Sequence, residues 1–313
     1  LEALGIFVPL YLTGSGLLLT FLKSSRLTLG TFNQQLVDEL SSFGDVKLVA
    51  DVKTAEAAKL DYVVGRMNNP EQDEKVFLQK LIIRGRVPVV SRRSFIEFAT
   101  GQVTSDDLPD LASIHLKDKL AFLQLKNLFD FTLSIPIGLV FLVLLLPIAL
   151  IIKIDSPGPV FFVQKRVGFR GATFSLIKFR TMTDDKNYQK NLGSRDDARI
   201  TKIGGFLRKS RLDELPQVIN VLRGEMSWIG PRPETVKLSK KYAKLVPNFR
   251  LRHLVKPGVT GWAQVHQGYT FGEDEFAEKV KFDLYYIKYF SFSLDVLIAF
   301  RTLSIILFRI GAR

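Results

Sequence analysis

The chain has 313 residues, a net charge of +13 and a positive mean hydropathy of +0.14, although 24% of its residues are charged. It contains no cysteine, which excludes disulfides, thiolate metal sites and thiol nucleophiles. Residues 1–152 carry a net charge of −1 and residues 153–313 a net charge of +14, so the basic excess lies in the second half. Such a region beside an apolar segment suits anionic lipid and phosphate-bearing substrates. Because no nucleic-acid-binding motif is present in the sequence, we expect membrane lipid rather than nucleic acid as the partner.

An uncharged, mostly apolar stretch runs from Ala3 to Leu22 and is long enough to cross a bilayer. Lys23 and Arg26 follow it, which places this end in the cytoplasm if the helix spans. We therefore predict a transmembrane helix over residues 1–23, with a signal-like or buried segment as the alternative. Since the chain starts at a leucine rather than a methionine, we expect the membrane region to be truncated in this sequence, with this helix as its last part.

Short apolar runs alternate with helical patterns between residues 24 and 115. The predicted strands are Val46–Val49, Tyr62–Val64 and Val87–Val90, and the predicted helices are Asn33–Phe43, Asp73–Arg84 and Ser94–Ala99. This alternation predicts a small α/β domain with a parallel sheet. No glycine-rich loop of the dinucleotide-binding type is present in the sequence, so we expect a structural or regulatory role for this domain.

The strongest apolar run extends without a charge over 22 residues, from Phe131 to Ile152. Pro136 and Pro147 lie inside it, and each proline lacks an amide hydrogen and crowds the carbonyl four residues earlier. We therefore expect the helix to kink or break at these two positions. Two arrangements are open: a kinked helix that spans the membrane, and a re-entrant hairpin that enters and leaves on the same face. Length and composition favour the spanning helix.

A β-hairpin is predicted next. Its strands and the turn between them are Val160–Val167, Thr173–Met182 and residues 169–171. The two-residue period of a strand puts Lys178 and Arg180 on the same face. Two neighbouring cations repel each other, which indicates a bound anion; a solvated edge strand is the alternative.

Residues 208–217 place three cations directly before two adjacent carboxylates, Asp213 and Glu214. Pro216 fits the first turn of a helix through Val218–Leu222, so the carboxylates are expected at the N-terminus of that helix. The helix dipole there favours ionised carboxylates and also a bound phosphate. An ionised carboxylate that faces an electrophilic phosphorus can act as a nucleophile, and nearby arginines neutralise the developing charge. A simple helix cap is the alternative.

Two further loops have features of ligand-binding loops. In residues 228–234, two prolines hold Arg232 in a stiff turn, where its guanidinium can bind phosphate bidentately. In residues 256–265, glycines permit close approach of a ligand and Trp262 offers a stacking face. Ordinary rigid turns explain both patterns as well. Near the end of the chain, residues 294–308 are helical and strongly apolar, which is typical of an interfacial amphipathic helix or of a buried helix.

The metal chemistry that the sequence favours is that of a hard cation. The histidines at positions 115, 253 and 266 lack zinc-type spacing, and the sequence contains no serine nucleophile elbow and no P-loop. We therefore expect Mg²⁺, bound by Asp213 and Glu214 together with substrate phosphates.

In their joint order, these segments resemble the monotopic phosphoglycosyl transferases, the bacterial sugar transferase family. The resemblance covers about residues 125–313, and its strength lies in the order of the motifs, since any single motif is weak. The matching segments are Phe129–Phe131, Gln164–Gly168, Lys178–Met182, Leu212–Gln217, Gly230–Pro233, Pro257–Gln264, Asp283–Tyr286 and Leu294–Asp295.

The resemblance implies an enzyme with a two-step reaction. Asp213 would attack the sugar-linked phosphate of a UDP-sugar and release UMP, and the phosphosugar would then pass to undecaprenyl phosphate. Glu214 would assist as a magnesium ligand or proton carrier. The residues implied to hold substrate phosphates are Lys178, Arg180, Arg208, Arg211 and Arg232. The implied substrate-binding loop contributes Thr260, Trp262, Gln264 and His266.

The resemblance also implies a fold and a location. Residues 24–115 would form a Rossmann-like α/β domain without a dinucleotide motif. Residues 116–313 would form a mainly α-helical monotopic membrane domain with a small β-hairpin and a re-entrant helical hairpin at about residues 126–153, which replaces the spanning helix favoured by composition. The enzyme would reside in the bacterial inner membrane with its catalytic domain on the cytoplasmic face. There it would initiate exopolysaccharide, capsule or O-antigen synthesis.

The sequence departs from the family pattern at two places. The family often has Ser-Pro at the hairpin break, whereas this chain has Ile135-Pro136 and Leu146-Pro147. After Gln264 the family commonly has asparagine, whereas this chain has His266, so the sugar is open and glucose or galactose is our expectation from larger members. The oligomeric state is open as well, a homo-oligomer included. The alternative to an enzyme is a non-catalytic membrane scaffold of a polysaccharide assembly complex.

Overall fold

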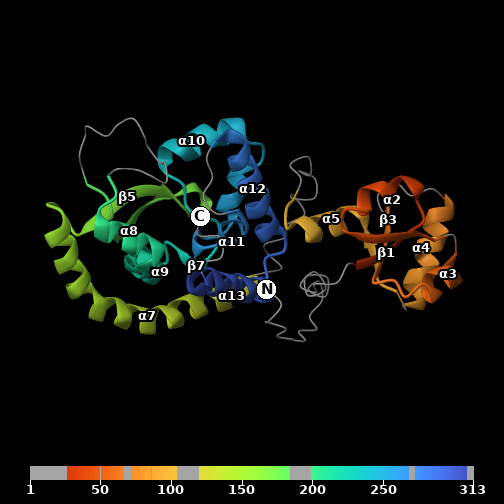
Figure 1. Ribbon diagram of the computed structural model, residues 1–313, viewed down its shortest axis with the longest axis horizontal. Helices are drawn as coiled ribbons and strands as arrows, with labels where there is room; N and C mark the ends of the chain where they lie inside the picture. Colours follow the sequence, from red (N-terminus) through yellow and green to blue (C-terminus); the bar gives the residue numbers. More distant parts are fainter. Residues whose placement is uncertain are drawn as a thin grey trace. The chain divides into compact units, whose positions relative to one another are not determined.

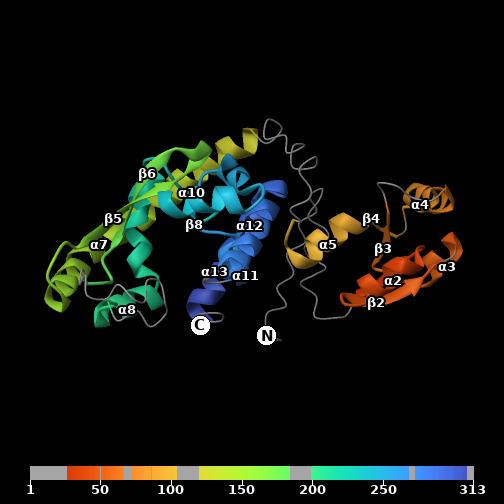
Figure 2. The ribbon, with the colours of Figure 1, turned by 90° about the horizontal axis from the view of Figure 1, so that it is seen from above.

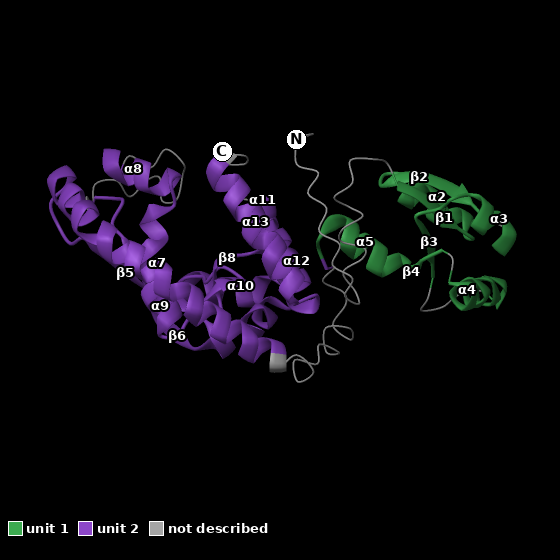
Figure 3. Ribbon diagram, turned by 90° about the horizontal axis from the view of Figure 1, so that it is seen from below, with its two compact units in different colours: residues 1–102 green, residues 103–313 purple. Residues whose placement is uncertain are grey.

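The computed structural model describes residues 27–49, 51–66, 72–85, 87–103, 120–183, 199–267 and 272–308. The chain divides into two compact units, residues 1–102 and residues 103–313, which are coloured separately in Figure 3. The transmembrane helix predicted over residues 1–23 lies outside the described residues.

The first unit is a four-stranded parallel sheet with helices on both faces. Its strands are β1 (Leu27–Thr31), β2 (Gly44–Leu48), β3 (Tyr62–Gly65) and β4 (Val89–Ser91), in the order β2-β1-β3-β4. Its helices are α2 (Gln34–Leu40), α3 (Val52–Ala57), α4 (Gln72–Arg84) and α5 (Arg92–Thr100). Side chains of α2 and α5 pack on one face of the sheet, and side chains of α3 and α4 pack on the other.

This arrangement confirms the predicted α/β alternation and parallel sheet. Strand β1 was absent from the prediction, since it lies next to the long apolar stretch that precedes it. Local capping defines the helices: the side chains of Asn33, Asp51 and Ser91 accept backbone N–H groups at the helix starts, and Gly101 ends α5 with φ +68°. The relation to a Rossmann fold stays a prediction.

In the second unit, helix α7 (Leu120–Asp155) is continuous over 36 residues and follows a curved path (Figure 1). The re-entrant hairpin is therefore not confirmed, because the helix continues without a break through Pro136 and Pro147. Two kinds of local feature favour the curvature of α7. The prolines disrupt the helical hydrogen bonding, and the hydroxyls of Thr132 and Ser134 donate back to the carbonyls four residues earlier, at 2.9 and 2.6 Å.

Helix α7 has one packed face and one exposed apolar face. Phe141, Ile148 and Ile152 are buried in a cluster with Phe179 and Val218. On the other face, large apolar side chains are exposed, among them Leu142, Val143, Leu146, Leu150 and Ile154. Residues Phe122–Asp155 are long and apolar enough to cross a membrane by length and composition. An exposed apolar surface of this extent is typical of membrane contact.

The predicted hairpin is confirmed. Strand β5 (Phe161–Val167) pairs antiparallel with β6 (Thr173–Phe179) around the short helix η2 (Phe169–Gly171). The turn requires positive φ angles at Arg170 and Gly171. Figure 2 shows the hairpin beside α7, and the rings of Phe179 and Phe141 meet there with centroids 6.1 Å apart. Lys178 lies in β6, so the paired strands hold its backbone in place.

The rest of the second unit consists of short elements that end in two longer helices. They are α8 (Lys202–Lys209), η4 (Leu212–Gln217), α9 (Val218–Leu222), β7 (Ser227–Ile229), α10 (Val236–Leu245), η5 (Phe249–Leu254), β8 (Gly258–Thr260), α11 (Trp262–Gln267), α12 (Glu273–Lys288) and α13 (Phe292–Phe308). Strands β7 and β8 pair in parallel. Because the carboxyl ends of parallel strands are neighbours, this pairing places the loop after β7 beside the residues that follow β8.

Polar contacts anchor the start of α7 to this framework. The Asp130 carboxylate accepts the Trp228 backbone N–H at 3.1 Å. Lys126 pairs with Asp295 of α13 at 2.6 Å, and the Tyr286 hydroxyl donates to the same carboxylate at 2.7 Å. Since Trp228 lies in β7, these contacts fix the apolar helix relative to the loop that carries Arg232.

Candidate active site

The acidic pair lies where the chain turns sharply between two helices. Arg211 has a left-handed backbone (φ +59°), which separates α8 from η4. Asp213 and Glu214 then fall in the first turn of η4, which leads directly into α9. Their side chains are almost buried, with 5% and 7% of each residue exposed. Val218 of α9 fixes the turn by packing in the core cluster with Phe179.

Glu214 is an ionised carboxylate held by arginine. Its Oε1 accepts a hydrogen bond from Arg232 at 2.7 Å and lies 3.8 Å from an Arg211 nitrogen. Burial raises the pKa of Glu214, but the charge and hydrogen bond of Arg232 and the charge of Arg211 outweigh it, so the pKa is lowered. Glu214 therefore orients Arg232 and is charged throughout the physiological range.

Asp213 has a different environment. Burial and the neighbouring Glu214 charge raise its pKa to about 6, against the opposing effects of Lys178, Arg232 and Arg211. Among the described residues no hydrogen-bond or ion-pair partner holds the Asp213 carboxylate. It is therefore an ionisable group close to several cations and free to engage a ligand.

Two further cations border the pair. Burial and the charge of Arg232 lower the pKa of Lys178 on β6 to about 8 and the pKa of Arg166 on β5 to about 10. Four cations thus act on two carboxylates, which leaves an excess of positive charge suited to a phosphate group. Arg166 was not among the predicted phosphate-binding residues, although it lies in one of the motifs quoted above.

Arg180 is placed differently from the prediction. Its guanidinium donates to the carbonyls of Ser156 and Pro157 at 2.7 and 2.8 Å, so it secures the turn after α7. The two-residue period fails there because β6 ends at Phe179, one residue earlier. Arg208 lies at the end of α8, where the described contacts do not join it to the acidic pair, and its phosphate-binding role stays a prediction.

The predicted substrate loop is packed into the fold rather than open. Trp262 is 3% exposed, and its ring stacks on Tyr285 with centroids 5.4 Å apart, so its predicted stacking face is occupied. His266 donates from Nδ1 to the Trp262 carbonyl, 2.8 Å away, and burial lowers its pKa to about 4, so it is neutral at pH 7. Gln264 donates to the Val259 carbonyl at 3.1 Å.

The substrate loop nevertheless adjoins the loop of Arg232. The Gly230 backbone N–H donates to the Thr260 carbonyl at 2.9 Å, through the pairing of β7 with β8. The Thr260 hydroxyl bonds to that of Thr302 on α13 at 2.8 Å. The structure thus brings together five of the predicted residues: Asp213, Glu214, Lys178, Arg211 and Arg232. The predicted substrate loop adjoins the loop that carries Arg232.

Comparison with known proteins decides the family. The family described as bacterial sugar transferase matches residues 121–309, which include all of these site residues and all of helix α7 except its first residue. The chain belongs to the bacterial sugar transferase family.

Three relatives illustrate the range of this family. The chain is 41% identical over 231 residues to a UDP-N-acetylgalactosamine-undecaprenyl-phosphate N-acetylgalactosaminephosphotransferase of Aeromonas hydrophila, covering 72% of this chain and 54% of the relative. It is 42% identical over 217 residues to a UDP-glucose:undecaprenyl-phosphate glucose-1-phosphate transferase of Xanthomonas campestris pv. campestris, covering 68% and 41%. An exopolysaccharide production protein PSS of Rhizobium leguminosarum bv. phaseoli is 40% identical over 187 residues, covering 58% and 94%.

This bacterial sugar transferase chain therefore spans about half the length, or less, of the first two relatives. The family match leaves out the four-stranded α/β unit, whose sheet lies before residue 121. The exposed apolar face of α7, together with relatives that act on undecaprenyl phosphate, indicates membrane association.

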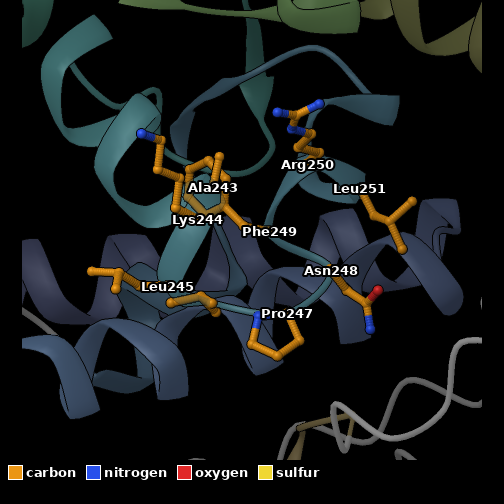
Figure 4. A pocket seen from close by; sticks show the side chains of 9 residues that line it. Ala243, Lys244, Leu245, Pro247, Asn248, Phe249, Arg250 and Leu251 are labelled. Atoms are coloured by element: carbon orange, nitrogen blue, oxygen red, sulfur yellow. The ribbon is translucent and has the colours of Figure 1, made fainter.

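One hollow in this bacterial sugar transferase lies away from the acidic pair. It has a volume of about 390 Å³ and is lined by the end of α10, the following turn and the start of η5 (Figure 4). Its lining contains no carboxylate and none of the predicted site residues. We therefore assign the chemistry to the acidic pair and not to this hollow.

Proposed function

We propose that the chain transfers a hexose 1-phosphate from a UDP-sugar to undecaprenyl phosphate and releases UMP. The observation that carries this proposal is the buried Asp213 carboxylate, with its pKa of about 6, among the cations Lys178, Arg211 and Arg232. Family membership and the names of the relatives support the reaction class. The enzyme would be an undecaprenyl-phosphate sugar phosphotransferase.

In the first step, a carboxylate oxygen of Asp213 attacks the phosphorus that carries the sugar. The bond between that phosphorus and the bridging oxygen of the diphosphate breaks, and UMP leaves with this oxygen. An aspartyl-phosphosugar intermediate results. With a pKa of about 6, about nine tenths of Asp213 is ionised at pH 7, so no separate base is required for this attack.

In the second step, a phosphate oxygen of undecaprenyl phosphate attacks the same phosphorus. The bond to the Asp213 oxygen breaks, which restores the carboxylate and yields an undecaprenyl diphosphate-linked sugar. The charge that develops on the transferred phosphate is stabilised by fixed guanidinium and ammonium groups, and Arg232 is the best placed because Glu214 holds it at 2.7 Å.

Asp213 and Glu214 fit a magnesium ion that is bound together with the substrate phosphates. No group of three or more metal-ligating side chains occurs among the described residues, but Mg²⁺ is commonly bound by one or two carboxylates together with substrate phosphates. Asp213 and Glu214 are adjacent and both are carboxylates, so they would hold the ion. When bound, the ion would neutralise phosphate charge.

The acceptor is a lipid phosphate, so the site must operate at a bilayer surface. We propose that α7 enters and leaves the membrane on one face, with its bend at the prolines and its exposed apolar face in lipid. The catalytic domain would then face the cytoplasm from the bacterial inner membrane. The product would initiate exopolysaccharide, capsule or O-antigen synthesis. Glucose or galactose is the proposed sugar, with His266 and its loop as the region that selects it.

The test is UMP release from a panel of UDP-sugars by the protein in detergent or nanodiscs, with undecaprenyl phosphate as the acceptor. We expect UMP from one sugar and near-complete loss of activity in Asp213→Asn. Asp155→Asn, which removes a carboxylate that caps α8, is the matched control and should retain activity. Release of UDP instead of UMP would refute the mechanism. Unchanged polysaccharide assembly in cells that carry Asp213→Asn would favour the scaffold.

A further inference from the structure

The loop that carries Arg232 is held by a bond at each of four consecutive carbonyls. The Pro231 carbonyl accepts the Gly258 backbone N–H, and the Glu234 carbonyl accepts the Val167 backbone N–H, both at 3.0 Å. Between them, the Pro233 carbonyl accepts from Arg166 at 3.0 Å and the Arg232 carbonyl accepts from Arg252 at 2.9 Å. Three segments of the chain, β5, η5 and the start of β8, therefore converge on one short loop.

Arg252 is the buried member of this set. Its side chain is 1% exposed, and two of its nitrogens donate to one oxygen of Asp283, at 3.0 and 2.6 Å. The nitrogen that makes the shorter of these bonds also donates to the Arg232 carbonyl. Asp283 on α12 thus orients the guanidinium that holds the loop.

A second buried ion pair also holds the loop that carries Arg232. Lys279 of α12 pairs with the Glu234 carboxylate at 2.5 Å, and an Arg252 nitrogen lies 3.8 Å from the same oxygen. Burial raises the pKa of Glu234, but Lys279 and Arg252 outweigh it and lower it to about 2. The cavity between residues 231–233 and Arg252 has a volume of only about 10 Å³, which is room for about one water molecule. The loop that carries Arg232 therefore packs directly on Arg252.

We infer that Arg252 is a positioning residue of the transfer reaction, which sets the Arg232 guanidinium over Glu214 by holding the Arg232 carbonyl. This inference rests on the proposed function. Among its described contacts Arg252 does not touch Asp213 or Glu214, so it acts through Arg232. Misplacement of a catalytic group by about 1 Å can cost on the order of 100-fold in rate.

A double-mutant cycle tests the inference by UMP release. Arg252→Lys keeps the buried charge but loses the fixed guanidinium fork, and we expect kcat/KM to fall on the order of tenfold. Arg232→Met should cost on the order of 100-fold. If Arg252 acts through Arg232, the double variant should be no worse than Arg232→Met within about twofold, since the group that Arg252 positions is already gone.

Arg180→Lys is the matched control. Arg180 is also a buried arginine that donates to backbone carbonyls, but at the turn after α7. Its effect should multiply with that of Arg232→Met, as expected of independent sites. Should Arg252→Lys be unfolded at the assay temperature, Asp283→Asn, which releases the Arg252 guanidinium, takes its place in the cycle.

Two outcomes separate this inference from the proposed function. If the wild-type protein releases UMP but the Arg252 and Arg232 effects multiply to about 1000-fold, Arg252 is merely structural and the inference is overturned. If the wild-type protein releases no UMP from any UDP-sugar, the proposed function itself fails.

Discussion

The pH dependence of UMP release should be bell-shaped, because two buried groups with opposite requirements border the reacting phosphate. Asp213 must be ionised to attack, and its pKa is raised to about 6 by burial and by Glu214. Lys178 must be protonated to stabilise phosphate charge, and burial and Arg232 lower its pKa to about 8. Activity is therefore lost as the pH falls through 6 and as it rises through 8, which gives an optimum near pH 7.

The magnitude follows from the ionised fractions. About nine tenths of Asp213 is ionised at pH 7, about half at pH 6 and about a tenth at pH 5, so kcat/KM should fall roughly tenfold between pH 7 and pH 5. The acid limb belongs to the coupled Asp213–Glu214 pair, of which Glu214 is already ionised. The assay is initial-rate UMP release from pH 5 to pH 9 at constant ionic strength.

Lys178→Arg supplies the control for the basic limb. An arginine stays protonated over this range, so the loss of activity above pH 8 should disappear while the acid limb is unchanged. Constant kcat/KM from pH 5 to pH 9 in the wild type would refute the assignment of Asp213 as the nucleophile. A basic limb that persists unchanged in Lys178→Arg would refute the role of Lys178.

Because the folded-state pKa of Asp213 is raised from 3.8 to about 6, its ionisation costs stability as the pH rises through this window. Asp213→Asn should therefore raise the free energy of unfolding at pH 7 by at most about 3 kcal/mol, which is measured as a higher Tm. An unchanged or lower Tm contradicts the raised pKa. Chelation by EDTA should abolish UMP release and Mg²⁺ should restore it; activity that persists after exhaustive chelation rules out a metal role for Asp213 and Glu214. Labels placed before Asp130 and after Lys153 should both report the cytoplasmic side, whereas labelling from opposite sides would show that α7 spans the membrane.

Local patterns predicted much of the secondary structure. The alternation of apolar runs and helical patterns predicted the parallel sheet of the first unit, and the two strands around residues 169–171 predicted the β5–β6 hairpin. Pro216 predicted a helix through Val218–Leu222 with the carboxylates at its N-terminus; that helix is α9, and the carboxylates lie in the short helix η4 directly before it. These succeed because periodicity, capping and turn chemistry act over a few residues.

Predictions that depended on element ends or on packing were less successful. Arg180 was expected beside Lys178, but β6 ends at Phe179 and the guanidinium turns to the Ser156 and Pro157 carbonyls. Trp262 was expected to offer an open face, but Tyr285 of α12 covers it. Neither the end of a strand nor the occupant of an aromatic face is encoded in the local pattern.

The sequence by itself determined that this protein has a long apolar helix, a basic second half and an acidic pair among cations. Hydropathy, net charge and residue order carry that information directly. Only the tertiary structure decided which cations meet the pair and what holds them in place. Arg252 donates to the Arg232 carbonyl, 20 residues earlier in the sequence, and to the Asp283 carboxylate, 31 residues later. Such contacts depend on how η5 and α12 pack rather than on any local pattern.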